Sequence, residues 1–430
     1  MFFEKLKEKV KEENILPILL FIVVLVNYLP IIALNFTTKM SRAIGIVPMA
    51  ISLFIECIIL IAYYYKKIQI KKEMCYNFLV LLVITVIFLI IQVINFFNNQ
   101  LKILDLANII CKFINIFLFY ILIMGVNVEE KYISNFMKAI VFMGIIACVQ
   151  NIILYYDDIL GHLGLVELNK GLYACKSFFP QKNPFAFFLY VSIISTIFLL
   201  QKDYKTMYKI FLSGALILFL FNLILTFSRT GTVITILFIV LYFLATNKIS
   251  KKTKIVAIIL SSAITIIVIC LLEQYNSGLL QRILRTETIK NFTGRTEFWD
   301  LSKEMLSESP INMLFGVGRF RATTLIEKYG VTQFHNTYVE FLVSGGILEL
   351  IYCMSFYIIV LIKIIKSKMD RKYKSIYILM ILTFFMYMLF ESLGRFSIGW
   401  SDTICMIFFI TIPLLHSNSS NEIKRLSEGK

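Results

Sequence analysis

Apolar runs of close to twenty residues recur along this chain and leave it few ways to fold. An α-helix needs about 20 such residues to cross the hydrocarbon core of a bilayer. Lipid offers the backbone no hydrogen-bonding partner, so these runs are helices; a closed barrel would show short alternating strands. Twelve runs can be read, at residues 14–36, 44–65, 75–97, 103–124, 134–156, 183–201, 208–227, 231–247, 255–273, 337–362, 375–392 and 397–415. The sequence therefore predicts an all-α, polytopic integral membrane protein of about twelve transmembrane helices, forming a single membrane domain over residues 1–430.

Composition excludes a soluble globular chain. Hydrophobic residues make up 59% of the sequence and charged residues 16%, whereas soluble domains hold about half apolar and a quarter charged residues. The first apolar run is too long for the core of a signal peptide and lacks an A-x-A-like cleavage site, so we expect an uncleaved first helix.

The lysines predict the orientation of the helices. With a cytoplasmic N-terminus, lysine-dense segments such as "KKIQIKK" and "KIIKSKMDRKYK" all fall on the inner side, as the positive-inside rule requires. Twelve crossings return the C-terminus to the cytoplasm. The formal charge of +16 is then a property of the inner membrane surface, and we expect no nucleic-acid partner.

The sequence predicts neither a disulfide framework nor a metal site or other cofactor. Among the eight cysteines only Cys175 falls clearly in an outer loop, and no C-x-x-C pair occurs. Asp157 and Asp158 are the only paired outer acids and suit the start of a solvated loop. His162, His335 and His416 lack the spacing of metal ligands.

The arginines contradict the pattern of the lysines. Two of the ten fall inside, and the others fall outside: Arg42, Arg229, Arg282, Arg285, Arg295, Arg319, Arg321 and Arg395. A guanidinium group presents a rigid fork of donors that matches carboxylate and phosphate. An outer set of arginines therefore suggests an anionic ligand, against the alternative of solvated loop residues or contacts with lipid headgroups.

Arg229 stands in "LTFSRTGTVI", where Ser228, Thr230 and Gly231 interrupt some forty apolar residues. Such a break predicts the end of one helix and the start of another, with Gly231 allowing a tight turn or a close helix approach. An ionisable residue at that position is a functional candidate. The alternative is an arginine that snorkels to the outer interface.

Residues 274–335 form the longest outer segment, between the ninth and tenth predicted helices. A structureless loop of this length is unusual, and we expect one or two short helices in it, interrupted at Pro310, Gly316 and Gly318. Arg295 and Trp299 lie four residues apart and would share one face of the first of these helices.

His335 follows this segment and precedes the run at 337–362, with Asn336 a candidate helix cap. A histidine at a helix start is commonly a cap or a packing residue. Together with outer arginines it acquires another interpretation, because transfer from a diphosphate-linked donor to a hydroxyl needs a base and an anion clamp. The diphosphate is a good leaving group and needs no acid.

Three further side chains are candidates for supporting roles. Glu297 and Glu391 could assist or replace His335 as base, or could pair with arginines. Asn183 in "FPQKNPFAFF" precedes Pro184 in a first helical turn, where it could cap the helix or contact a ligand headgroup.

Four stretches occur in a recognisable order: "FSRTG" (227–231), "GRTEFW" (294–299), "FGVGRF" (315–320) after Pro310, and "FHNTYVEFLVSGGILEL" (334–350). Together with "QKNPFAFF" before the sixth run, this set resembles the O-antigen ligase/polymerase family of bacterial surface-glycan enzymes. The helix number and the place of the long outer segment resemble that family as well.

The resemblance implies a metal-independent membrane glycosyltransferase that acts on the outer face of the cytoplasmic membrane. Its donor would be an undecaprenyl-diphosphate-linked glycan, its acceptor a second glycan, and membrane lipid its surroundings. Arg229 and Arg295 resemble the family's diphosphate-binding arginines, with Arg319 a third match. His335 resembles the essential histidine, as base or diphosphate contact, and Glu391 a family acidic position.

Two activities occur in the family, and the composition favours one of them. Heavy use of Lys, Ile, Asn, Phe and Tyr suggests an AT-rich genome, such as that of a Gram-positive bacterium, which has no lipid A. We therefore expect a polymerase of capsule, exopolysaccharide or O-antigen repeat units that releases undecaprenyl diphosphate. The alternative is an O-antigen ligase acting on lipid A-core. Flippase and chain-length regulator proteins are candidate partners. A transporter, such as a lipid-linked oligosaccharide flippase, is the alternative to an enzyme. Such a transporter needs internal repeats, and the sequence shows none.

Overall fold

The computed structural model describes residues 130–162, 174–179, 181–246, 295–327, 333–395 and 400–427, with scattered positions between 83 and 97. This described part is helical and contains no β-strand, as predicted. The predicted runs at 14–36, 44–65, 103–124 and 255–273 lie outside the described residues, as does the outer segment up to residue 294.

Four helices of the described part are long and apolar enough to cross a membrane: Ile133–Leu154 within α6 (Glu130–Leu154), α8 (Lys182–Leu200), α9 (Thr206–Leu225) and α17 (Thr337–Lys366). Two shorter apolar helices are α10 (Arg229–Ala245) and the stretch Met406–Asn418. These helices confirm the all-helical membrane character. The count of twelve spans stays a prediction, because four described helices meet the length and hydropathy that crossing requires.

The described helices fall into two compact units. The first, here the α8 unit, comprises residues 137–296 and 370–387. It contains most of α6, then α7 (Tyr156–His162), α8, α9, α10 and α18 (Arg371–Met388). The second, here the α17 unit, includes Glu297–Met369 and the described residues from Met388 onward. It contains most of α14 (Arg295–Ser307), then α15 (Pro310–Phe315), α16 (Arg319–Glu327), α17, α19 (Trp400–Cys405), the π-helix η3 (Met406–Thr411) and α20 (Ile412–Ser427).

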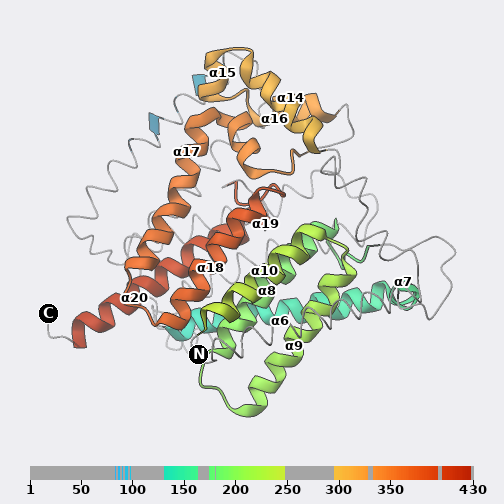
Figure 1. The fold of residues 1–430 in the computed structure, drawn as a ribbon, viewed down its shortest axis with the longest axis vertical. Helices are drawn as coiled ribbons and strands as arrows, with labels where there is room; N and C mark the ends of the chain where they lie inside the picture. Colours follow the sequence, from blue (N-terminus) through green and yellow to red (C-terminus); the bar gives the residue numbers. More distant parts are fainter. Residues whose placement is uncertain are drawn as a thin grey trace, which may run out of the picture. The chain divides into compact units, whose positions relative to one another are not determined.

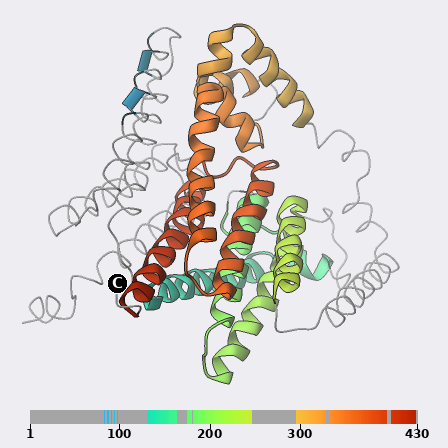
Figure 2. The same ribbon diagram turned by 60° about the vertical axis from the view of Figure 1, so that its left-hand side comes forward.

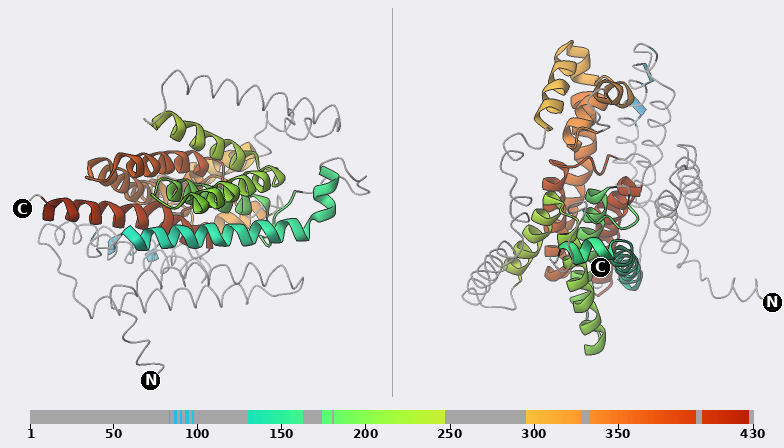
Figure 3. Two further views of the ribbon diagram at one scale, coloured as in Figure 1. Left: turned by 90° about the horizontal axis from the view of Figure 1, so that it is seen from below. Right: turned by 90° about the vertical axis from the view of Figure 1, so that its right-hand side faces the viewer.

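Helix α8 is the core of the α8 unit. Fifteen consecutive residues, Phe185–Leu199, are buried, which is the pattern of a helix that is apolar on every face. Helices α9 and α10 lie beside it (Figure 1), and α6 extends along the same group (Figure 3). Gly144 of α6 permits this close packing, because a Cβ there would meet the Ser192 hydroxyl at 2.7 Å and the Phe219 ring at 2.9 Å.

A buried polar network fixes the segment that leads into α8. The side-chain amide of Asn151 donates to the Asn222 side-chain oxygen at 2.9 Å. The side-chain oxygen of Asn151 accepts from the Ser177 backbone N–H at 2.8 Å, and the Ser177 hydroxyl donates to the Ala147 carbonyl at 2.8 Å. Since buried polar groups are costly unless they are paired, these bonds hold residues 174–179 against α6 and α9.

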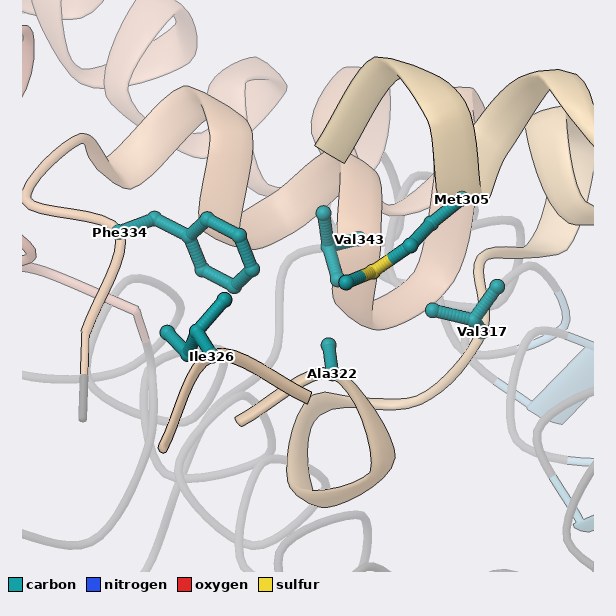
Figure 4. Close-up of a cluster of buried hydrophobic side chains, with 6 residues drawn as sticks. All are labelled: Met305, Val317, Ala322, Ile326, Phe334 and Val343. Atoms are coloured by element: carbon teal, nitrogen blue, oxygen red, sulfur yellow. The ribbon is translucent and has the colours of Figure 1, made fainter. Parts of the chain in front are cut away.

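In the α17 unit three short helices gather at the N-terminal end of α17 (Figure 2). Their contact is a cluster of buried side chains (Figure 4): Met305, Val317, Ala322, Ile326, Phe334 and Val343. The described part of the predicted outer segment thus contains three short helices, where one or two were expected, and its place outside the membrane stays a prediction. Ser309 caps α15 by accepting from the Asn312 N–H, with Pro310 in the first turn, which is a common N-terminal arrangement.

Paired glycines let two backbones touch in this unit. Helix α17 is interrupted at Gly345 and Gly346, and Gly346 has a φ of +73°. A Cβ on Gly346 would collide with the backbone of Leu314 and Phe315, and a Cβ on Gly316 would lie 2.6 Å from the Gly345 nitrogen. The glycines of "FGVGRF" and "SGG" therefore allow a contact between the end of α15 and the break in α17.

Helix α18 corrects the prediction for Glu391. The run at 375–392 placed this residue in a helix, but α18 ends at Met388 and residues 391–395 are non-helical. Backbone carbonyl groups of this segment instead bind side chains of α17. The Thr337 hydroxyl lies 2.8 Å from the carbonyl oxygens of Glu391 and Leu393, and the Tyr357 hydroxyl donates to the Gly394 carbonyl at 2.9 Å.

Candidate functional site

The first group of predicted site residues meets in the α8 unit, where α8 and α10 begin side by side. Helix α9 ends at Leu225 and α10 begins at Arg229, as the break in the apolar run predicted. The Ser228 hydroxyl donates to the side-chain oxygen of Asn183 at 3.0 Å and also accepts from the Gly231 N–H at 3.4 Å as the cap of α10. Asn183 therefore binds the neighbouring helix, while the N-cap residue of its own helix is Gln181.

This corner contains two cations at two positive helix ends. Lys182 is the first residue of α8 and Arg229 the first of α10. The Lys182 ammonium group donates to the Phe227 carbonyl at 3.2 Å, which holds the two helix starts together. A helix N-terminus carries partial positive charge and favours acids in its first turn, yet the first turns of α8 and α10, both described, contain no acidic residue.

The local sequence explains the shape of this corner. Phe227 has a φ of +49°, which turns the chain sharply between α9 and α10. A Cβ on Gly231 would lie 2.6 Å from the Ala186 Cβ and 3.1 Å from the Tyr387 hydroxyl. Gly231 therefore allows α10 to approach α8 closely enough for Ser228 to reach Asn183, which confirms the close helix approach that was one expectation for this glycine.

The second group meets in the α17 unit around His335. The Nδ1 atom of His335 lies 3.4 Å from Oε2 of Glu391, and the two side chains are 24% and 8% exposed. His335 has a φ of +51°, in the left-handed region that residues other than glycine rarely adopt. Its ring is thus partly accessible, and one of its nitrogens faces a carboxylate.

Asn336 is the N-cap of α17, as predicted. Its side-chain oxygen accepts from the N–H groups of Tyr338 at 2.9 Å and Val339 at 3.2 Å. The Trp299 indole N–H donates to the Phe334 carbonyl at 3.1 Å, so α14 is attached to the residue directly before His335. Asn336 supports the histidine by beginning the helix that follows it.

Three charged residues near His335 did not enter the predicted site: Glu340, Arg395 and Asp402. The Arg395 N–H donates to Oδ1 of Asp402 at 2.9 Å, and its Nη2 donates to Oδ2 at 3.3 Å. Its Nη1 lies 3.9 Å from Oε2 of Glu340. Burial would lower the pKa of Arg395, but the charges of Asp402 and Glu340 raise it overall, so this guanidinium stays charged. A sequence signal existed, since Glu340 is an acid inside a predicted transmembrane helix.

The remaining predicted residues belong to the short helices. Arg295 is the first residue of α14, and Glu297 is exposed in the same first turn. Arg319 begins α16 directly after Gly318. Trp299 follows Arg295 by four residues within α14, as predicted.

In the described residues no cluster of three or more His, Cys, Asp or Glu side chains has the arrangement of a metal site. A cavity of about 150 Å³ is lined by Gln201, Tyr242, Thr246 and Lys372, among others. It lies at the C-terminal ends of α8 and α10, whereas Asn183, Ser228 and Arg229 lie at their N-terminal ends.

Comparison with protein families identifies a match in the middle of the chain. Residues 214–354, about a third of the chain, match the family described as O-Antigen ligase. The matched stretch includes Arg229, Arg295, Arg319 and His335, and excludes Asn183 and Glu391. No curated protein matches the chain. The resemblance drawn from the sequence motifs is thus confirmed, and the apolar helices with this match indicate an integral protein of the inner membrane.

Proposed function

Because this chain carries an O-antigen ligase domain over residues 214–354, we propose that it polymerises undecaprenyl-diphosphate-linked oligosaccharide repeat units of a capsule, exopolysaccharide or O-antigen. The reaction takes place on the outer face of the cytoplasmic membrane and needs no metal ion. Both termini are cytoplasmic, and flippase and chain-length regulator proteins supply the donor and limit the product. The family match supports glycosyl transfer from a lipid-linked glycan in general. The choice of polymerase over ligase rests on the amino-acid composition.

The observation that carries the proposal is the pair of positive helix ends at Lys182 and Arg229. Two parallel helices present their N-termini at one place, each with a cation in a first turn free of acids. The partial positive charge of a helix N-terminus and the charge of a cationic side chain both attract an anion. A diphosphate matches this concentration of positive charge, and helix N-termini are common binding sites for phosphate.

In the proposed step a hydroxyl oxygen of the acceptor glycan attacks the anomeric carbon of the donor. The bond between that carbon and the diphosphate oxygen breaks, and undecaprenyl diphosphate leaves with the electron pair. Arg229 and Arg295 hold the developing charge, with Arg319 as a third contact and Asn183 and Ser228 as support. Direct displacement of this kind inverts the configuration at the anomeric carbon.

The proton of the attacking hydroxyl goes to His335. Its Nδ1 faces Glu391 at 3.4 Å, so a tautomer with hydrogen on Nδ1 leaves Nε2 free of hydrogen and able to accept a proton. Glu391 then stabilises the imidazolium that forms, while Asn336 fixes the helix behind the histidine. Glu297, exposed in the same first turn of α14 as Arg295, is a further candidate for support.

The test uses purified protein in lipid nanodiscs containing a lipid-diphosphate-linked repeat unit, with a chelator present. Lipid A-core is offered in a parallel reaction as the alternative acceptor. A ladder of lengthened glycans supports the polymerase, and a single transfer to lipid A-core supports the ligase. No new glycosidic bond with either acceptor contradicts the proposal. Movement of intact donor between leaflets without bond formation would instead indicate a flippase.

A further inference from the structure

Glu340 binds both chain segments that carry the His335–Glu391 pair. Its Oε1 accepts a hydrogen bond from the Phe334 backbone N–H at 3.0 Å and a second from the Ser392 hydroxyl at 3.0 Å. Phe334 directly precedes His335, and Ser392 directly follows Glu391. One carboxylate oxygen therefore links the two neighbours of the pair.

The second oxygen of Glu340 faces a buried cation. Glu340 is 5% exposed, and its Oε2 lies 3.9 Å from Nη1 of Arg395. Arg395 in turn is held by two bonds to Asp402, which is 1% exposed. A buried carboxylate is stable only when it is paired and hydrogen-bonded, and Arg395 meets the first of these needs for Glu340.

The pair has a particular need for such support. His335 lies in the left-handed region, and such strained conformations persist only where surrounding contacts hold them. Glu391 lies beyond the end of α18 in a non-helical segment. Neither residue is fixed by helical backbone bonds at its own position, so tertiary contacts set the distance between the two side chains.

We infer that Glu340, with Arg395 as its counter-ion, is a positioning residue that holds His335 and Glu391 at hydrogen-bonding distance. Thr337 contributes through its contacts with the carbonyl groups of Glu391 and Leu393. Glu340 touches neither donor nor acceptor. This inference rests on the proposed glycosyl transfer for its effect on catalysis, but its structural part is measurable without activity.

The decisive variants are Glu340→Gln and Glu340→Ala. Gln keeps an oxygen that accepts from Phe334 and Ser392, whereas Ala removes it. We expect Glu340→Ala to lower kcat by about 10²-fold, since misplacement of a reacting group by about 1 Å has an effect of that size. Its KM for the donor should change little, because other residues bind the diphosphate. Glu340→Gln should keep kcat within about fivefold of the wild type.

Hydrogen exchange gives a readout that is independent of catalysis. In Glu340→Ala the amide of Phe334 should exchange faster, along with the segment around residue 392, while in Glu340→Gln it should stay protected. Glu304→Ala, at an exposed position of α14, is the matched control and should change neither readout. Size-exclusion profiles and melting temperatures identify any variant that is simply unfolded.

Three results would overturn the inference: a folded Glu340→Ala with wild-type kcat, equal loss of kcat in Ala and Gln, or an effect confined to KM. If the wild type forms no glycosidic bond, the proposed function fails while the exchange data still test the structural link. Unchanged exchange at Phe334 in Glu340→Ala would reject that link by itself.

Discussion

The Ser228 hydroxyl donates a 3.0 Å hydrogen bond to the side-chain oxygen of Asn183, and this bond joins the first turns of α8 and α10. It sets the place of Arg229, which follows Ser228 directly. The two residues lie 45 positions apart and come from different apolar runs. The alignment of two positive helix ends in the α8 unit thus depends on two small polar side chains.

Loss of the hydrogen bond between Ser228 and Asn183 should reduce both stability and activity, whichever of the two residues is replaced. Ser228→Ala loses both the cap and the bond to Asn183, and we expect about 1–2 kcal/mol less stability with lower transfer activity. Asn183→Ala should cost about 1 kcal/mol. Because both variants remove the same hydrogen bond, the double variant should lose less stability and less activity than the sum of the two single losses. Thermal unfolding and turnover measure these losses. Ser213→Ala, at an exposed position of α9, should have no effect; fully additive losses would contradict the coupling.

Replacement of the proposed diphosphate-binding arginines by lysine should impair transfer despite the conserved charge. Lysine cannot reproduce the bidentate fork of a guanidinium group. We expect Arg229→Lys and Arg295→Lys each to slow transfer by about 10²-fold, measured as product formed per minute at saturating acceptor. Arg371→Lys, at the exposed start of α18, is the matched control. Full activity in either variant would remove that arginine from the clamp.

Gly346 should tolerate no side chain. Its φ of +73° with a ψ of −166° is open almost only to glycine, at a cost of about 1–3 kcal/mol for other residues. A Cβ would also collide with the backbone of Leu314. Gly346→Ala should therefore lower the melting temperature in detergent. Gly214→Ala in α9, where a Cβ meets nothing within 4 Å, should leave the melting temperature unchanged or raise it. Equal shifts in the two variants would argue against the close contact between the end of α15 and the break in α17.

Cys175 should resist alkylation at pH 8. Burial, with a smaller contribution from the charge of Asp158, raises the pKa of its thiol to about 12. Only the thiolate reacts, and a pKa well above the working pH leaves little of it. Peptide mass spectrometry after maleimide treatment should find Cys175 unmodified in the folded protein and modified in guanidinium. Rapid labelling of the folded protein would show that the segment at residues 174–179 is not packed as described.

Local sequence patterns were sufficient for several elements. The run at 183–201 corresponds to α8 at Lys182–Leu200, because the length of an apolar run sets the length of a buried helix. The cap at Asn336 was predictable because capping is local chemistry. The break at Arg229 was predictable for the same reason.

Tertiary contacts decided what the sequence did not indicate. Apolar residues continue past Met388, so the pattern could not reveal that α18 ends there and that Glu391 lies in a non-helical segment bound to Thr337. Gly345 and Gly346 interrupt α17 because another backbone passes against them, which sequence spacing does not show. The contact of Ser228 with Asn183 likewise requires the packing of α10 on α8.

The most direct test of the account is the release of undecaprenyl diphosphate during bond formation. Purified protein in nanodiscs would be given the lipid-linked donor and a glycan acceptor with chelator, and lipid products counted by mass spectrometry. We expect one undecaprenyl diphosphate to be released per new glycosidic bond in the wild type and in the control His162→Ala. In His335→Ala the rate should fall by about 10²-fold or more. Bond formation at the wild-type rate in His335→Ala, or no release with any acceptor, would contradict it.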